Sequence, residues 1–207
     1  MLQCFSMELH TAPGSVAGIV LAAGGSSRFG APKQILTWQG KPLVWHVAHK
    51  ALQADLSPVF VVGGALMPEL EAALDDLSVT LLHNPDWQQG QSTSVRVGIK
   101  AVPPSGAGAL ILLADQPHIP VELIRSLKRV HATTRAPIVA PRVQGRRANP
   151  VLWDRQTFDA LADLDGDVGG RVLFSRYAVE WVPWKDDWIR FDIDTPEDYQ
   201  TFLDAHA

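Results

Sequence analysis

The chain has 207 residues, of which 46% are hydrophobic and 19% are charged, which indicates a globular protein with a full core and excludes a disordered chain. Its formal net charge of −4 argues against general electrostatic binding to nucleic acid or to an anionic membrane. The single cysteine, Cys4, excludes a disulfide framework or a cysteine-based metal site within one chain.

No apolar run approaches the roughly 20 residues that a membrane-spanning helix needs. Residues 1–10 lack the basic and apolar regions of a secretory signal. We therefore expect a cytoplasmic protein without a membrane partner.

Residues 1–14 show no clean periodicity and are predicted to form a flexible N-terminal extension, whereas residues 15–207 are predicted to form a single domain. Apolar runs in this domain have the length of buried strands. They are continuous rather than alternating, which is typical of parallel strands that are covered on both faces. The predicted strands are residues 16–23, 59–62, 79–82, 109–114, 138–140 and 179–183.

Helical spacing of apolar residues is found between the predicted strands. The predicted helices begin at 40–42, cover 66–77 and 95–102, begin at 120, cover 158–164 and begin at 195. Thr195 is the predicted N-cap of the last helix, and Thr93 or Ser94 is the predicted cap of the helix at 95–102. This alternation predicts an α/β fold with a three-layer, doubly wound, mostly parallel sheet of Rossmann-like type, whose ligands bind beyond the carboxyl ends of the strands.

A glycine-rich, cationic loop follows the first predicted strand at residues 24–33. Gly24 and Gly25 allow the backbone to approach an anion closely, so that successive N–H groups can point into one concavity. Arg28 and Lys33 add positive charge to the same loop. The pattern predicts a phosphate-binding loop, and the alternative is that both cations are solvated loop residues.

Two common nucleotide-binding loops are excluded at this place. Gly25 and Gly30 match the glycines of G-x-x-x-x-G-K-[ST], but Ala31 occupies the lysine position and no Ser or Thr follows it. The G-x-G-x-x-G pattern is also missing after the strand, which argues against a hydride-transfer enzyme.

Asp115 follows the apolar strand at 109–114, where an unpaired carboxylate would be costly. A bound Mg²⁺ would remove that cost and bridge phosphate oxygens. The alternative is an ordinary turn residue before Pro117. Asp192 and Asp194 are one residue apart, so an extended chain would direct both toward the same face. They are candidate metal ligands or, alternatively, caps of the last helix.

The segment LAAGGSSRFGAPKQIL at residues 21–36 resembles the signature of GT-A-like nucleotidyltransferases, L-A-A-G-x-S-x-R-[FM]-G-x-x-K. Further segments match in order, namely HNPDWQQGQSTSV, LLADQP, NPVL, GDVGGR and DIDTPEDY. Over residues 16–204 the chain is therefore similar to the molybdenum cofactor cytidylyltransferase group of the MobA-like NTP transferase superfamily.

This resemblance implies a GT-A nucleotidyltransferase fold and attack by a substrate phosphate on the α-phosphate of an NTP, with release of pyrophosphate. It implies CTP as co-substrate, a phosphorylated pterin that carries molybdenum as acceptor, Mg²⁺ as cofactor, and a molybdoenzyme or its chaperone as protein partner. The implied catalytic residues are Arg28, Lys33 and Asp115, and the implied metal ligands are Asp115, Asp192 and Asp194. The implied nucleotide-binding residues are Leu21, Ala22, Ala23, Gly24, Gly25, Ser26, Gly63, Gly90 and Ser94.

On the acceptor side, Arg146, Arg147 and Asn149 form a basic, polar approach suited to a phosphorylated acceptor. Residues 142–148 are predicted to form a turn-rich loop, and residues 166–171 either close over the acceptor or form an ordinary turn. Asn149 stands where the family often has a histidine, which leaves the acceptor open.

Two alternatives to cytidylyl transfer onto the pterin remain. One is transfer from CTP or GTP to another phosphorylated small molecule. The other is a non-catalytic nucleotide sensor or cofactor-delivery chaperone, against which the joint presence of Arg28, Lys33, Asp115 and Asp194 speaks.

Overall fold

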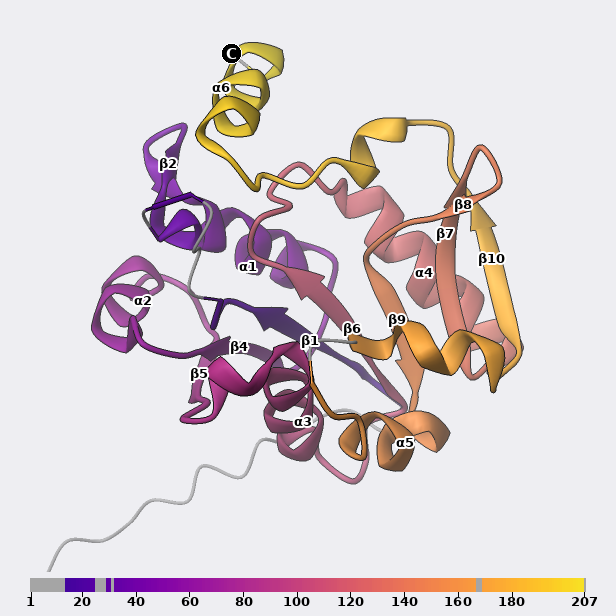
Figure 1. Cartoon of the computed structure of the whole chain (residues 1–207). Coiled ribbons are helices and arrows are strands. Elements are labelled where there is room, and N and C mark those ends of the chain that lie inside the picture. Colours follow the sequence, from indigo (N-terminus) through magenta and orange to yellow (C-terminus); the bar gives the residue numbers. More distant parts are fainter. Residues whose placement is uncertain (1–13, 25–28, 31, 167–168, 207) are drawn as a thin grey trace, which may run out of the picture.

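A mostly parallel sheet organises the computed structural model, which describes residues 14–24, 29–30, 32–166 and 169–206 (Figure 1). In the described residues the sheet has eight strands, seven of them in the order β10-β7-β9-β6-β1-β4-β5, with β8 paired to β7. The strand bounds are β1 Val16–Leu21, β4 Val59–Gly63, β5 Thr80–His83, β6 Gly108–Leu113, β7 Ile138–Val143, β8 Arg146–Arg147, β9 Val151–Asp154 and β10 Val179–Pro183, with a separate small pair of β2 Thr37–Trp38 and β3 Lys41–Pro42.

Strand β1 lies at the centre and pairs in parallel with both β4 and β6. Strands β4 and β5 are also parallel to each other, as are β7 and β10. Strand β9 runs antiparallel between β6 and β7. The predicted mostly parallel sheet is thus confirmed, and the carboxyl ends of β1, β4, β5 and β6 meet at one edge.

The predicted loop at residues 142–148 is wrong in part, because β7 continues to Val143 and turns back into β8. Gln144 and Gly145 connect the two strands and both have positive φ, at 48° and 78°. Two such residues make the turn whose twist fits a tight hairpin. Arg146 and Arg147 are therefore held on a strand rather than on a free loop.

Helices cover both faces of the sheet, as the three-layer prediction requires. Figure 1 shows α1 and α4 on one side, and α3 and α5 on the other. Apolar side chains of β1 alternate between the two sides, with Val20 in the core beneath α1 and α4 and Ile19 in the core beneath α3 and α5. The helix bounds are α1 Leu43–Gln53, α2 Met67–Ala73, α3 Gln91–Ala101, α4 Val121–Thr134, α5 Phe158–Ala162 and α6 Pro196–Ala205, and the 3₁₀ turns are η1 Lys33–Ile35, η2 Trp87–Gln89, η3 Arg155–Thr157, η4 Gly169–Ser175 and η5 Asp187–Arg190.

The beginnings of α3 and α6 test two predicted caps. Helix α3 begins at Gln91 rather than at residue 95, and its N-cap is Gly90 with φ 118° and no side-chain cap bond, so Thr93 and Ser94 do not cap it and the prediction is wrong. For α6 the prediction is confirmed, because Thr195 Oγ1 accepts the Asp198 N–H at 3.1 Å and Asp198 accepts the Thr195 N–H in return.

The C-terminal segment returns across the molecule and places α6 beside β2 (Figure 1). Fully buried Ile193 and Phe202 pack with Leu43 of α1. This packing brings residues 192–194 back toward η1, which follows the glycine-rich loop. Among the described residues, no helix has the length and apolar character to cross a membrane. The N-terminal extension remains a prediction, since residues 1–13 lie outside the described residues.

Candidate active site

A cavity of about 530 Å³ lies where β1 and β6 end. Residues just after these two strands form one wall, and the start of α3 with the preceding turn forms another. Parallel sheets bind their ligands at this edge. The lining residues are Leu21, Ala22, Ala23, Gly24, Lys33, Gln34, Trp87, Gln88, Gln89, Gly90, Gln91, Ser94, Leu113, Ala114 and Asp115.

Three charged side chains meet at the rim of this cavity. Lys33 Nζ lies 2.6 Å from Asp115 Oδ2 and 2.6 Å from Asp194 Oδ1. Burial lowers the pKa of Lys33, but Asp115 and Asp194 outweigh that effect and hold this pKa above its ordinary value. The structure thus brings together a cation of η1 and carboxylates that follow β6 and precede α6.

Asp115 keeps one oxygen without a partner. Its Oδ1 is buried and accepts no hydrogen bond from any described residue, while Oδ2 is paired with Lys33. A buried, unpaired carboxylate oxygen is costly unless a ligand satisfies it. This atom is therefore the point at which a cation or a bound phosphate with its cation fits the site.

Asp192 lies next to this group and is held by a different partner. Its Oδ1 accepts a 2.7 Å hydrogen bond from Gln116 Nε2. Loss of hydration and the charge of Asp115 raise the pKa of Asp192 above its ordinary value. The two candidate ligands of the C-terminal segment therefore differ, since Asp194 contacts Lys33 and Asp192 contacts Gln116.

Within the described part of the chain, no group of three acidic, histidine or cysteine side chains converges closely enough to hold a metal alone. Mg²⁺ does not require such a cage, because it commonly binds one or two carboxylates, water and substrate phosphates. The unpaired oxygen of Asp115 and the neighbouring carboxylate of Asp194 fit that mode of binding.

The predicted phosphate loop is described only in part. Gly25, Ser26 and Arg28 lie outside the described residues, so their predicted roles stay predictions. Ala22, Ala23 and Gly24 line the cavity. Gln34, which the sequence reasoning missed, is almost fully buried, and its Nε2 donates to the carbonyls of Ala22 and Gly24 at 3.2 and 3.1 Å.

The beginning of α3 contributes Gly90 and Ser94 to the cavity, as expected. A second missed residue, Asn84, is buried behind them, and its Nδ2 donates to Ser94 Oγ at 2.9 Å and to Thr93 Oγ1 at 2.8 Å. The amide thus occupies an acceptor position of Ser94 Oγ, which leaves the hydroxyl proton to be donated elsewhere. The Asn-Pro pair directly after a strand was the available signal for Asn84.

Gly63 is not among the cavity-lining residues. A Cβ atom at Gly63 would lie 2.7 Å from Leu70 Cδ1 and from Met67 Sδ, so close packing against α2 accounts for this glycine. Gly64 instead approaches the site, since a Cβ there would lie 2.8 Å from the Ala23 carbonyl oxygen.

A second cavity of about 290 Å³ adjoins the first, because Leu21, Gln91 and Leu113 line both. Arg147, Asn149 and Arg171 reach it from three segments. Burial and the neighbouring Arg171 lower the pKa of Arg147. No carboxylate lines this cavity among the described residues.

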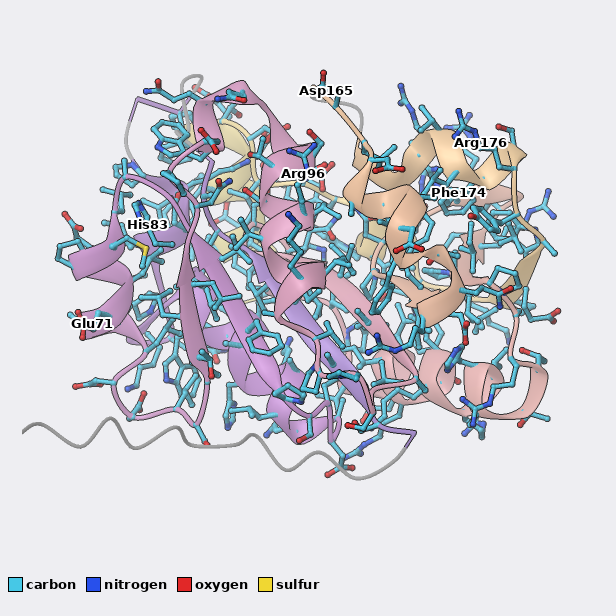
Figure 2. All side chains as sticks on the ribbon, turned by 90° about the horizontal axis from the view of Figure 1, so that it is seen from below. Glu71, His83, Arg96, Asp165, Phe174 and Arg176 are labelled. Carbon is cyan, nitrogen blue, oxygen red and sulfur yellow. The ribbon has the colours of Figure 1, made fainter. Side chains whose placement is uncertain are left out.

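An aromatic side chain and a tethered segment support the second cavity. The Arg147 guanidinium lies 4.4 Å from the ring centre of Phe174 on η4. Arg96 of α3 donates to the Ala162 and Leu164 carbonyls at 2.8 and 2.7 Å, which ties the end of α5 to α3. Figure 2 views this side of the molecule, with Arg96 and Phe174 labelled.

A model of the MobA-like NTP transferase domain matches residues 18–181. This range contains the lining residues of both cavities. The chain belongs to this family. The MobA-like assignment agrees with the site geometry, in which Gly24, Lys33 and the Asp115 carboxylate line one cavity at the carboxyl edge of the sheet.

Relatives of the MobA-like chain carry different activities in their names. The molybdenum cofactor cytidylyltransferase of Escherichia coli is 27% identical over 193 residues, covering 91% of this chain and 96% of the relative. Nicotine blue oxidoreductase of Paenarthrobacter nicotinovorans is 29% identical over 198 residues, with the same shares covered. The purine catabolism protein PucB of Bacillus subtilis is 31% identical over 193 residues, covering 88% and 93%.

A solved structure shares the fold over nearly the whole chain. Rv0371c of Mycobacterium tuberculosis superposes with a TM-score of 0.83 at 26% identity, covering 93% of this chain and 100% of that one. The same protein has also been solved as a complex with manganese, which matches with a TM-score of 0.78. These matches confirm the Rossmann-like nucleotidyltransferase fold.

Proposed function

We propose that this protein transfers CMP from CTP to the phosphate of a molybdenum-carrying pterin, with Mg²⁺ as cofactor and pyrophosphate as the second product. The observation that carries the proposal is the contact of Lys33 with both Asp115 and Asp194 at the cavity rim. It joins a cationic side chain to two carboxylates of the kind that bind metal ions, beside a cavity that in this proposal takes the triphosphate. The Escherichia coli relative, named molybdenum cofactor cytidylyltransferase, supports the choice of reaction.

In this proposal the chain's own groups bind and orient the triphosphate. Backbone N–H groups of the loop after β1 face its oxygens, with Arg28 at the β- and γ-phosphates. Lys33 reaches the α-phosphate, where it neutralises charge that develops as the acceptor phosphate attacks. Ser94 donates its hydroxyl proton to an acceptor atom of the base, because Asn84 already donates to its oxygen.

Asp115 would hold Mg²⁺ through its unpaired oxygen, together with Asp194 or Asp192. When bound, the ion supplies charge neutralisation and a template for the phosphate oxygens.

The acceptor occupies the second cavity in this proposal. Arg147 and Arg171 form no ion pair with any carboxylate in the described residues, so their charges are available to an anionic ligand. Two such guanidinium groups suit a phosphate. They favour a phosphorylated acceptor over an uncharged one.

The experiment is a turnover assay of the purified chain with each of the four NTPs, Mg²⁺ and the molybdenum-loaded phosphopterin. Of the four NTPs, only CTP is expected to give pyrophosphate release, together with incorporation of CMP into the acceptor. At a Mg²⁺ concentration that half-saturates the wild type, Asp115→Asn should show strongly reduced turnover, and Asp75→Asn, a change of an exposed carboxylate away from the cavity, should keep the wild-type rate. Turnover with GTP, or with another phosphorylated acceptor only, would replace the proposed substrate pair. Nucleotide binding without any turnover would favour the sensor.

A further inference from the structure

The first peptide groups after β1 direct their carbonyls into the protein. Gln34 Nε2 donates to the Ala22 carbonyl at 3.2 Å and to the Gly24 carbonyl at 3.1 Å. A side-chain amide nitrogen has two hydrogens, so both are used by these two bonds. Gln34 is 4% exposed, and its place on the short η1 turn is next to Lys33.

The carbonyl between these two, that of Ala23, lies close to Gly64. A Cβ atom at Gly64 would lie 2.8 Å from the Ala23 carbonyl oxygen and 2.7 Å from Trp87 Cγ. Such distances are shorter than the van der Waals contact of carbon with either atom. Only a residue without a Cβ therefore lets this carbonyl and the Trp87 ring approach β4 so closely.

The orientation of these carbonyls fixes the direction of the backbone N–H groups. In a trans peptide the N–H points opposite to the C=O. The Ala23 N–H, in the same peptide as the Ala22 carbonyl, therefore points away from Gln34. The Gly24 N–H, in the same peptide as the Ala23 carbonyl, points away from Gly64. Neither N–H donates to any acceptor within the described residues. Both residues line the cavity. N–H groups that face a phosphate would stabilise it, whereas a flipped peptide would present a carbonyl oxygen, which repels it.

We propose that Gln34 and Gly64 are positioning residues for the peptide groups of residues 22–24. Gln34 acts by bonding to the Ala22 and Gly24 carbonyls and Gly64 by leaving room for the Ala23 carbonyl, so that the N–H groups rather than the carbonyl oxygens face a bound phosphate. The inference rests on the proposed function only in that the large cavity takes a triphosphate. It requires neither CTP as the nucleotide nor a pterin as the acceptor.

The test measures equilibrium binding of inorganic tripolyphosphate and of cytidine, each with Mg²⁺, by titration calorimetry. Gln34→Met keeps the length of the side chain and removes the donors, and we expect about ten-fold weaker tripolyphosphate binding, the loss of two ordinary hydrogen bonds. Gln34→Glu should weaken it further, because a carboxylate repels the carbonyls and the ligand. Gly64→Ala should act in the same direction. Cytidine, which has no phosphate, should bind as to wild type.

Gln53→Met is the matched control, since Gln53 is exposed at the end of α1, and it should change neither affinity. The unfolding temperature of each variant without ligand identifies a variant that fails to fold. If the Gln34 variants do not fold, the tripolyphosphate affinity of Gly64→Ala still tests the proposal.

Unchanged tripolyphosphate binding in folded Gln34→Met and Gly64→Ala would overturn the proposal, as would equal losses for tripolyphosphate and cytidine, or a wild type that binds no tripolyphosphate. A wild type that binds tripolyphosphate but shows no turnover contradicts the proposed function alone.

Discussion

Lys33 Nζ lies 2.6 Å from Asp115 Oδ2, and the same nitrogen lies 2.6 Å from Asp194 Oδ1. One ammonium thus balances carboxylates that come from the end of β6 and from the segment before α6. The Lys33 side chain is 19% exposed, so the contact is partly screened from solvent. In the proposed function these two carboxylates would hold Mg²⁺, and the Lys33 ammonium would then be available to a phosphate of the nucleotide.

Substitution of Lys33 tests this arrangement. Lys33→Met should lower kcat by about 10²-fold or more, because in the proposed function it removes a charge that stabilises the transition state. Lys41→Met is the control, since Lys41 forms a similar 2.7 Å pair with exposed Asp76, and it should leave kcat unchanged. Steady-state kinetics with saturating substrates provide the comparison. Equal kcat values for the two variants would contradict a catalytic role of Lys33.

Asp115 should control the response to metal. For Asp115→Asn we expect the Mg²⁺ concentration for half-maximal activity to rise at least about ten-fold, because a neutral amide replaces the carboxylate that a hard cation prefers. The measurement is a Mg²⁺ titration of pyrophosphate release after removal of metal with a chelator. Full activity of the wild-type enzyme in excess chelator would contradict the proposed need for a metal ion.

The two arginines of the second cavity should affect only the acceptor. Arg147→Gln and Arg171→Gln should each raise the KM for the phosphorylated acceptor by about ten-fold, the value of a lost charge-assisted bond. The KM for the NTP should change little, because neither residue lines the larger cavity. Arg129→Gln on α4, whose side chain is away from both cavities, is the control. A rise in the NTP KM instead would contradict the assignment of the second cavity.

Buried His118 should make the stability of the protein depend on pH. Burial, together with the positive charges of His206 and Lys50, lowers the pKa of His118 to about 4. Below an ordinary histidine pKa of about 6.5, the unfolded chain takes up a proton that the folded chain refuses. Stability is therefore lost as the pH falls from about 6.5 toward 4, by up to about 3 kcal/mol in total.

Denaturant unfolding of wild type and His118→Phe at pH 7 and pH 4 checks this expectation. The aromatic replacement suits a site between Trp188, Phe191 and Phe202, and the variant should lose less stability on acidification. The control, His83→Phe, changes an exposed side chain and should follow wild type. Parallel pH profiles for wild type and His118→Phe would show that His118 is not the group responsible.

Gly98 should be needed for the packing of α3 against the sheet. A Cβ atom there would lie 2.5 Å from Cγ2 of Ile19, which is fully buried in β1. Alanine gains about 1 kcal/mol of helix propensity over glycine, but overpacking a fixed core costs about 1–3 kcal/mol. We expect Gly98→Ala to lower the free energy of unfolding, by up to about 2 kcal/mol. Lys100→Ala, exposed on the same helix, should change it by no more than about 0.5 kcal/mol.

Much of the fold was predictable from the sequence because its signals are local. A continuous apolar run predicts a buried strand, and β10 was predicted with the bounds that the structure has. Thr195 and Asp198 are three positions apart, so their capping box is contained in the sequence. The start of α3 was misjudged, because Gly90 replaces a side-chain cap and polar residues occupy the first turn.

Part of the site was equally local. Ala22 to Gly24 and Asp115 directly follow apolar strands, and strand ends of a parallel sheet meet at one edge whatever their order. Their presence at one cavity was therefore determined by the sequence alone. The sequence also determined that the loop lacks the residues of a P-loop.

Only the tertiary structure decided which groups touch one another. The antiparallel insertion of β9 and the return of the C-terminal segment bring Arg147 and Arg171 to one cavity and Asp194 to Lys33. Gln34 carries no motif that distinguishes it from a surface glutamine, and its two bonds exist because η1 packs beneath the loop. Periodicity reports how each segment is buried, whereas contacts between distant segments depend on strand order and on the packing of the layers.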